Sequence, residues 1–360
     1  MIRTVKMASN DINSGKLRGV KEFLRTYNFC VNYFIRRLWS EKIFEGQFVD
    51  GLYIESAKKR FHLTSRLIQC AGKQALEIVK SQRKKTDNQK SMPRFKRLSA
   101  NLDSRFWKIT KNQNTYEWLR LQSGFDFLVP FNRTKMWNKW SDNDFELSSS
   151  LRIFIRKDKL VIEFFFEKDA PELKSEGETE GLDLGYRNLA VCSNGQTVGG
   201  RMDRVIKSFS RREKHTHRQM EQRSFQELKK LDLSNVSMLV VENLKHVKSG
   251  TRGTFSRSHN RRMSHWLYAK VREWLKQRCE EQGIRLEFKS PFATSQYCRF
   301  CGNWDRRNRS GDRFHCIHCG HEDHADSNGS WNLKLLGLAG VYSLRLLTSS
   351  MIGHLNMGNI

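Results

Sequence analysis

Residues 294–332 read TSQYCRFCGNWDRRNRSGDRFHCIHCGHEDHADSNGSWN, and this stretch decides how the carboxy-terminal half of the chain folds. It contains two Cys-x-x-Cys pairs, each followed by a glycine, at Gly302 and Gly320. Glycine adopts at little cost the positive φ that such tight turns use. Two turns of this kind supply four sulfur ligands in the tetrahedral arrangement that zinc prefers. The predicted zinc ligands are Cys298, Cys301, Cys316 and Cys319.

The spacing of the two pairs is typical of a small zinc ribbon. The fourteen residues 302–315 between them are enough for a hairpin. Because protein atoms fill all four positions, we expect a structural zinc, and neither a catalytic zinc nor a disulfide pair. Nearby histidines offer an alternative ligand set, but with four cysteines present we interpret them as outer or surface residues. These are His315, His318, His321 and His324.

The chain as a whole is strongly basic. Its 360 residues include 65 Lys and Arg against 38 Asp and Glu, which gives a formal net charge of +27. A field of this size favours a polyanionic partner. We expect nucleic acid rather than an anionic membrane, because no apolar run approaches the length needed to span one. No apolar stretch of a secretory signal follows the first charges. Four isolated cysteines are interpreted as buried thiols in a reducing compartment: Cys30, Cys70, Cys192 and Cys279.

The amino-terminal half predicts a short strand followed by helices. The strand is expected over residues 2–8, and apolar residues spaced by three and four predict a helix from Leu17 to Leu38. A second helical stretch covers about 52–85 and breaks before Thr64, which is suited to cap a further helix.

From about residue 100 to 168 the pattern turns to β. Residues 151–156 and 160–166 predict a hairpin. The acidic, aperiodic segment 168–180 then predicts a domain boundary. Beyond it, apolar strands alternate with helices, as in an α/β domain. The expected strands lie near 181–184, 187–191, 236–241 and 284–288, and the expected helices cover 204–232, 261–282 and the residues after the ribbon.

Three carboxylates stand out by their positions. Asp183 lies inside an apolar strand, Glu242 ends another, and Asp326 begins the helix after the ribbon. Each alone could be a helix cap, a salt bridge or a surface charge, although a buried aspartate is costly without a partner. If the strands are neighbours, the acids converge, and an oxygen-only ligand set suits Mg²⁺. Two such ions can hydrolyse a phosphodiester, so we predict a nuclease site.

With these motifs the chain resembles a known family. The segments GLDLG (181–185), VVENL (240–244), TSQ-x-C-x-x-C-G and HADSN-x-x-x-N are similar to the RuvC-like nuclease domain of TnpB transposon-encoded proteins and compact type V CRISPR effectors. The resemblance is specific over about 181–333. It departs in two places: the segment 201–235 is short for the family, and Gly329 and Ser330 stand where alanines are usual.

The resemblance implies a multidomain α+β protein that cuts DNA under the direction of a guide RNA. An amino-terminal β-barrel-like wedge with an inserted helical recognition lobe would precede an RNase H-like (RuvC) α/β nuclease with an inserted four-cysteine ribbon. The implied bounds are 1–12 and 87–170 for the wedge, 13–86 for the lobe, 171–180 for a linker, 181–293 and 321–360 for the nuclease, and 294–320 for the ribbon, which binds target nucleic acid.

The resemblance also implies an active site and its ligands. Asp183, Glu242 and Asp326 would hold two Mg²⁺ ions, which Mn²⁺ can replace. The partners would be the guide RNA and a target DNA with a short flanking motif, and the setting the nucleoid of the prokaryotic cytoplasm. Two alternatives stay open: a nuclease-inactive RNA-guided DNA-binding protein, and a guide-free transposase or resolvase of the same fold. Monomer and homodimer, and transposon-borne and CRISPR-associated origin, are equally open.

Overall fold

The computed structural model describes residues 1–9, 12–43, 51–85, 91–111, 117–122, 126–185, 187–210, 216–244, 267–347 and 351. The chain divides into two units, Met1–Asp169 and Ala170–Ile360. The division falls at the start of the acidic segment that predicts a boundary. Among the described helices, none is long and apolar enough to cross a membrane.

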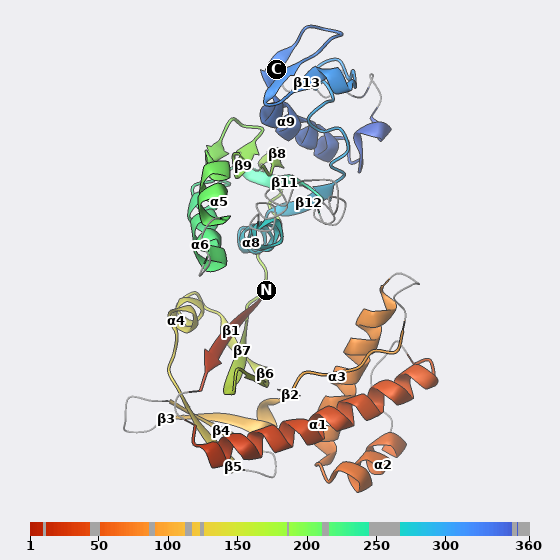
Figure 1. Ribbon diagram of the computed structural model, residues 1–360, viewed down its shortest axis with the longest axis vertical. Helices are drawn as coiled ribbons and strands as arrows, with labels where there is room; N and C mark the ends of the chain where they lie inside the picture. Colours follow the sequence, from red (N-terminus) through yellow and green to blue (C-terminus); the bar gives the residue numbers. More distant parts are fainter. Residues whose placement is uncertain are drawn as a thin grey trace. The chain divides into compact units, whose positions relative to one another are not determined.

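The first unit contains two antiparallel sheets (Figure 1). One has the order β1-β7-β6-β2, built from β1 (Ile2–Ala8), β7 (Lys159–Glu167), β6 (Glu146–Arg156) and β2 (Ser99–Leu102). The other has the order β3-β4-β5, built from β3 (Trp107–Lys111), β4 (Glu117–Gln122) and β5 (Asp126–Phe131). The predicted hairpin is confirmed as β6 and β7. Its two-residue loop, Lys157–Asp158, has positive φ at both positions, as the twist of a tight hairpin requires.

Four helices complete the described part of the first unit: α1 (Ser14–Ser40), α2 (Gly51–Phe61), α3 (Ser65–Arg83) and the short α4 (Lys135–Ser141). The predicted break before α3 is confirmed, since the Thr64 side chain accepts a hydrogen bond from the backbone N–H of Leu67. The apolar stripe of α1 is buried, with Leu24, Val31 and Phe34 inaccessible to solvent. One continuous apolar core joins these helices to the strands.

The second unit is built on a five-stranded sheet of order β10-β9-β8-β11-β12 (Figure 1). The strands are β8 (Glu178–Asp183), β9 (Ala190–Cys192), β10 (Thr197–Val198), β11 (Val236–Glu242) and β12 (Arg285–Lys289). Strands β8, β11 and β12 run parallel, while β9 and β10 are antiparallel to their neighbours. β8 begins at Glu178, within the segment 171–180 that we expected as a linker.

Helices cover both faces of this sheet. α5 (Met202–Ser210), α6 (Thr216–Leu228) and α8 (Tyr268–Glu281) pack on one face, where Leu239 and Val241 of β11 are buried. α9 (Ala325–Leu338) packs on the other face (Figure 1). There Val240, Leu333 and Leu336 belong to one apolar cluster. A single helix over 204–232 was expected, but α5 ends at Ser210 and α6 starts at Thr216, with 211–215 outside the described residues. The start of the helix predicted over 261–282 also lies outside them, up to residue 266.

The ribbon lies between β12 and α9 in the chain, as predicted. It contains a small antiparallel sheet of β13 (Arg309–Ser310), β14 (Arg313–His315) and β15 (Glu322–His324). β13 and β14 form the hairpin expected between the two cysteine pairs. The described remainder includes three short 3₁₀ turns, Ser104–Phe106, Arg306–Asn308 and Leu344–Leu346.

Candidate active site

Two of the three predicted carboxylates lie at the ends of adjacent parallel strands. Asp183 is the last residue of β8 and Glu242 the last of β11. The register pairs Leu182 with Val241, so the two acids occupy the next position along both strands. Side chains alternate between the faces of a strand. Glu242 therefore shares its face with Val240, and Asp183 shares its face with Gly181, which is the face that α9 covers.

Glycines bring α9 close enough to add the third carboxylate. A Cβ at Gly181 would lie 1.9 Å from the backbone oxygen of Ser330 and 2.6 Å from the backbone nitrogen of Lys334. A Cβ at Gly337 would lie 2.4 Å from Cγ2 of Val240. Only glycine permits such an approach. Asp326 stands in the first turn of α9, so the close packing delivers it to the ends of β8 and β11.

All three carboxylates line one cavity of about 480 Å³. Its wall also includes Arg187, Thr294, Ser295, Arg309 and Asp312. Among the described residues, the four cysteines are the only group of three or more His, Cys, Asp or Glu side chains whose ligand atoms all lie within 4.8 Å of one another. The oxygens of the three carboxylates therefore do not all lie within 4.8 Å of one another.

Burial and mutual repulsion raise the pKa of two of these acids. The pKa of Asp183 lies well above its usual value, mainly through burial and then through the charges of Glu242 and Asp326. Burial raises the pKa of Glu242 to about 7, although a hydrogen bond from Thr294 and the charge of Arg309 oppose the shift. Divalent cations would relieve this repulsion, and the oxygen donors are those that Mg²⁺ takes. The residues present therefore fit Mg²⁺.

Three residues that sequence reasoning missed surround the acids. The Thr294 hydroxyl donates to Oε1 of Glu242 at 2.5 Å, and the Asn188 amide donates to Oδ2 of Asp326 at 3.2 Å. Arg309, on β13, donates to Ser295 and to the Gly311 carbonyl and faces the cavity. Thr294 opens the TSQ motif, so its position was visible in the sequence. Nothing local distinguishes Asn188 or Arg309 from the many other polar and basic residues.

The four cysteines form the predicted cluster. Sγ of Cys298 lies 3.6 Å from Sγ of Cys319, and Sγ of Cys301 lies 3.6 Å from Sγ of Cys316. Tetrahedral zinc with bonds of about 2.3 Å places its sulfurs roughly 3.8 Å apart, so the geometry fits zinc. Gly302 and Gly320 have φ of 74° and 76°, as predicted.

The histidines contribute no ligand to the described cluster, as interpreted. His315 contacts Glu322, and His321 packs edge-on against Phe300. His324 caps α9 by accepting from the Asp326 N–H. His318 is exposed.

Two asparagines of α9 attach the ribbon to the helix that carries Asp326. Asn332 donates to the carbonyls of Thr294 and Tyr297, both at 2.7 Å, and Asn328 donates to the Tyr297 carbonyl at 2.8 Å. Both asparagines are fully buried, so these bonds are shielded from water. Buried hydrogen bonds therefore join α9 to the backbone of Thr294 and Tyr297, just before the first cysteine turn.

Comparison with known proteins agrees with the motifs. The family model of the TNB domain of Cas12f1-like proteins matches residues 268–333. The CRISPR-associated endodeoxyribonuclease Cas12f1 of Sulfoacidibacillus thermotolerans is 36% identical over 77 residues, which are 21% of this chain and 18% of that protein. A TnpB-like protein of Aquifex aeolicus (strain VF5) is 36% identical over 107 residues, 28% of this chain and 34% of that protein. The matched segments thus span about a fifth and a third of these two curated relatives.

A solved structure shares the fold of this chain. A cryo-EM structure of a Cas12f1–sgRNA–target DNA complex matches 88% of this chain and 82% of that chain, with a TM-score of 0.56 and 13% identity. The chain therefore has the multidomain α+β fold of that effector. Together with the family model and the two relatives, this confirms the resemblance to TnpB proteins and type V effectors.

Proposed function

We propose that this protein is an RNA-guided DNA endonuclease whose active site is formed by Asp183, Glu242 and Asp326. The observation that carries the proposal is the convergence of these three carboxylates, from two strand ends and one helix start, on a single cavity. Carboxylates brought this close repel one another, and a bound divalent cation offsets that repulsion. We infer an RNase H-like nuclease for the second unit, because its central parallel strands β8 and β11 both end in a carboxylate at this cavity.

The residues around the acids support phosphodiester hydrolysis. When bound, two Mg²⁺ ions would lower the pKa of an attacking water and stabilise the charge on the leaving 3′-oxygen. Thr294 holds one oxygen of Glu242, which leaves the other free to face the cavity. Asn188 does the same for Asp326. Arg309 adds a positive charge to a cavity otherwise rich in carboxylates, beside which a phosphate can lie.

The proposal of guidance by RNA rests on the resemblance to these proteins and on charge. The matched effector structure is a complex with guide RNA and target DNA, and the net charge of +27 here favours the same kind of partners. We assign residues 1–12 and 87–170 to a wedge and 13–86 to a recognition lobe. We assign residues 178–293 and 325–360 to the nuclease and 294–324 to the zinc ribbon, since β8 begins at Glu178 and β15 belongs to the ribbon sheet. Pairing would read the target sequence while protein reads a short flanking motif, in the prokaryotic cytoplasm.

The test uses protein purified with the RNA it retains when expressed with its native flanking DNA. Cleavage of a DNA that matches this RNA should require Mg²⁺ or Mn²⁺. Asp183→Asn should lower the rate by at least about a hundredfold while target binding persists, because the substitution removes a metal ligand and leaves the nucleic-acid surfaces intact.

Asp169→Asn is the matched control, since Asp169 is exposed and does not line the carboxylate cavity. It should cut as the wild type does. If Asp183→Asn also kept wild-type cleavage, the assignment of the active site would be wrong. If the wild type bound the target and never cut it with either metal, the chain would be an RNA-guided binding protein.

A further inference from the structure

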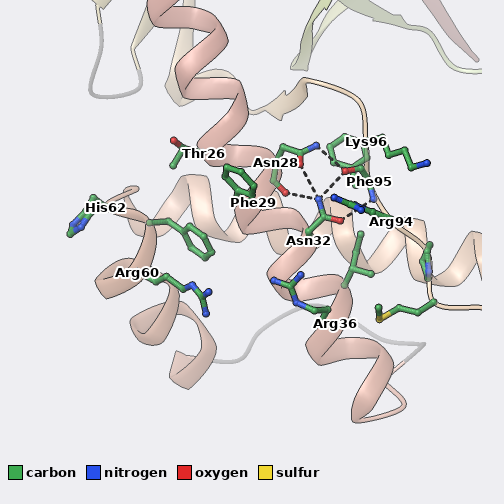
Figure 2. Close-up of a pocket in the computed structure, with 14 residues that line it drawn as sticks. Thr26, Asn28, Phe29, Asn32, Arg36, Arg60, His62, Arg94, Phe95 and Lys96 are labelled. Atoms are coloured by element: carbon green, nitrogen blue, oxygen red, sulfur yellow. Dashed lines mark hydrogen bonds between the residues drawn. The ribbon is translucent and has the colours of Figure 1, made fainter.

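The first unit contains a second, larger cavity that the nuclease chemistry does not use. It has a volume of about 1130 Å³ and is lined by α1, by the end of α2 and by the extended segment 92–96 (Figure 2). Its lining includes Arg36, Arg60, Arg94 and Lys96, together with His62. None of the residues lining it is acidic.

The arginines of this cavity differ from those of the unit that are paired with acids. Arg66 pairs with Asp103, and Arg133 with Glu117. In contrast, no ion pair to a described carboxylate involves Arg36, Arg60 or Arg94, and all three side chains are exposed. Like charges gathered without counter-charges repel one another, and a polyanion relieves that repulsion.

Hydrogen bonds within the protein hold one wall of the cavity in place before any ligand binds. Asn32 accepts from the Phe95 N–H at 2.9 Å and donates to the Phe95 carbonyl at 2.8 Å. Asn28 donates to the carbonyls of Phe95 and Arg97, both at 3.0 Å (Figure 2). These bonds fix the extended backbone along α1, so that Arg94 is presented at a defined place. Fixing the wall before binding lowers the entropy that a ligand must overcome.

An aromatic ring completes the arrangement. Phe29 of α1 is 63% exposed, although burying such a side chain would contribute about 2 kcal/mol. Figure 2 shows Phe29 close to the strip of α1 that carries Asn32 and Arg36. Arg60 also lies over the rings of Tyr33 and Phe61, at 5.9 and 5.7 Å from their centroids. The exposed ring of Phe29 beside a cationic wall is an arrangement with which proteins bind unpaired bases.

We propose that this cavity binds a short unpaired stretch of nucleic acid, with a base stacked on Phe29 and backbone phosphates against Arg36, Arg60 and Arg94. The class of ligand rests on the proposed function, but the site is separate from the carboxylates. A duplex keeps its base faces covered and so cannot stack on Phe29. The stretch can come from the guide RNA or from a DNA strand, since both offer the same phosphates and base faces.

The test measures binding of short fluorescent oligouridylate and oligothymidylate to the RNA-free full-length chain, without Mg²⁺, over a range of salt. Phe29→Ala should weaken binding by roughly tenfold and leave the salt dependence unchanged, because it removes stacking and no charge. Arg94→Gln should lower the slope of log affinity against log salt by about 0.7, because it removes one phosphate contact. The tighter of the two oligonucleotides identifies the source as RNA or DNA.

Two exposed residues of the same unit serve as matched controls. Ile2 is 62% exposed and Arg156 is exposed, and neither lines the cavity. Ile2→Ala and Arg156→Gln should bind as the wild type does. Equal losses in the controls, no loss in Phe29→Ala, or an equal effect of Phe29→Ala on a duplex would each overturn the proposal. Cleavage plays no part in this measurement, so failure of the nuclease assignment would show separately, in the Asp183→Asn assay.

Discussion

Gly181 determines how close α9 comes to the two strand-borne acids, although it has no side chain of its own. Gly181→Ala should lower the melting temperature of the second unit by about 5 °C. The added Cβ meets the backbone of Ser330 and Lys334, which cannot rotate away, and overpacking of this kind costs about 2 kcal/mol. Thermal unfolding followed by circular dichroism measures the shift.

Gly200→Ala is the control for this substitution, since its Cβ would meet nothing nearer than an Asn188 oxygen at 3.9 Å. A wild-type melting temperature in Gly181→Ala would show that α9 packs less closely than described. The same variant should cleave more slowly, because displacement of α9 moves Asp326.

At the residue scale, the acids were predictable and their partners were not. Asp183 and Glu242 stand out because a carboxylate in or at the end of an apolar strand is costly unless something requires it. Thr294 and Asn188 carry no such local cost. Their roles depend on contacts with Glu242 and Asp326, which are 52 and 138 residues away in the chain. Pairing at such distances is set by the assembled sheet and cannot be read from neighbouring residues.

Among the structural elements, the zinc ribbon is the one whose folding we expect to depend on a bound metal. The wild-type chain should hold a single zinc ion, and Cys316→Ser should lose it, since three ligands no longer close the site. Without zinc the Thr294 hydroxyl and Arg309 lose their positions, so cleavage should fall by about a hundredfold. Zinc released to a colorimetric chelator on denaturation measures the metal content.

Cys70→Ser provides the comparison, because Cys70 lies on α3 in the other unit. It should retain zinc and activity. A Cys316→Ser protein with full zinc content would contradict the four-cysteine site.

Helices and strands could be predicted from the local sequence where its pattern was strong. The Thr64 cap, the β6–β7 hairpin and the strand β11 all have short-range causes: a side-chain cap, a two-residue turn and an apolar run. The single helix expected over 204–232 corresponds to two helices, α5 and α6, and residues 211–215 between them lie outside the described residues. The early start of β8 at Glu178 could not be foreseen, because Glu180 is buried there with Ser193 and Lys334, which lie on other elements.

At the scale of the whole molecule, each unit has its own apolar core, which is why the acidic segment near 170 was a sound guide to the division. The order of strands was not accessible in the same way. β1 pairs with β7 so that Ile2 lies opposite Glu167, a partnership between the two ends of the unit. The local pattern showed a strand at each place but not that they are neighbours.

The central claim is that this chain cuts DNA where a bound RNA directs it, with the carboxylate cavity as the cutting site. The most direct measurement exchanges the guide segment of the copurifying RNA for another sequence and maps the cuts on a DNA that carries both targets. We expect the cut to move to the new target, to require Mg²⁺ and to disappear after RNase treatment. Cleavage that stays at the original target, or that survives RNase treatment, would contradict the account.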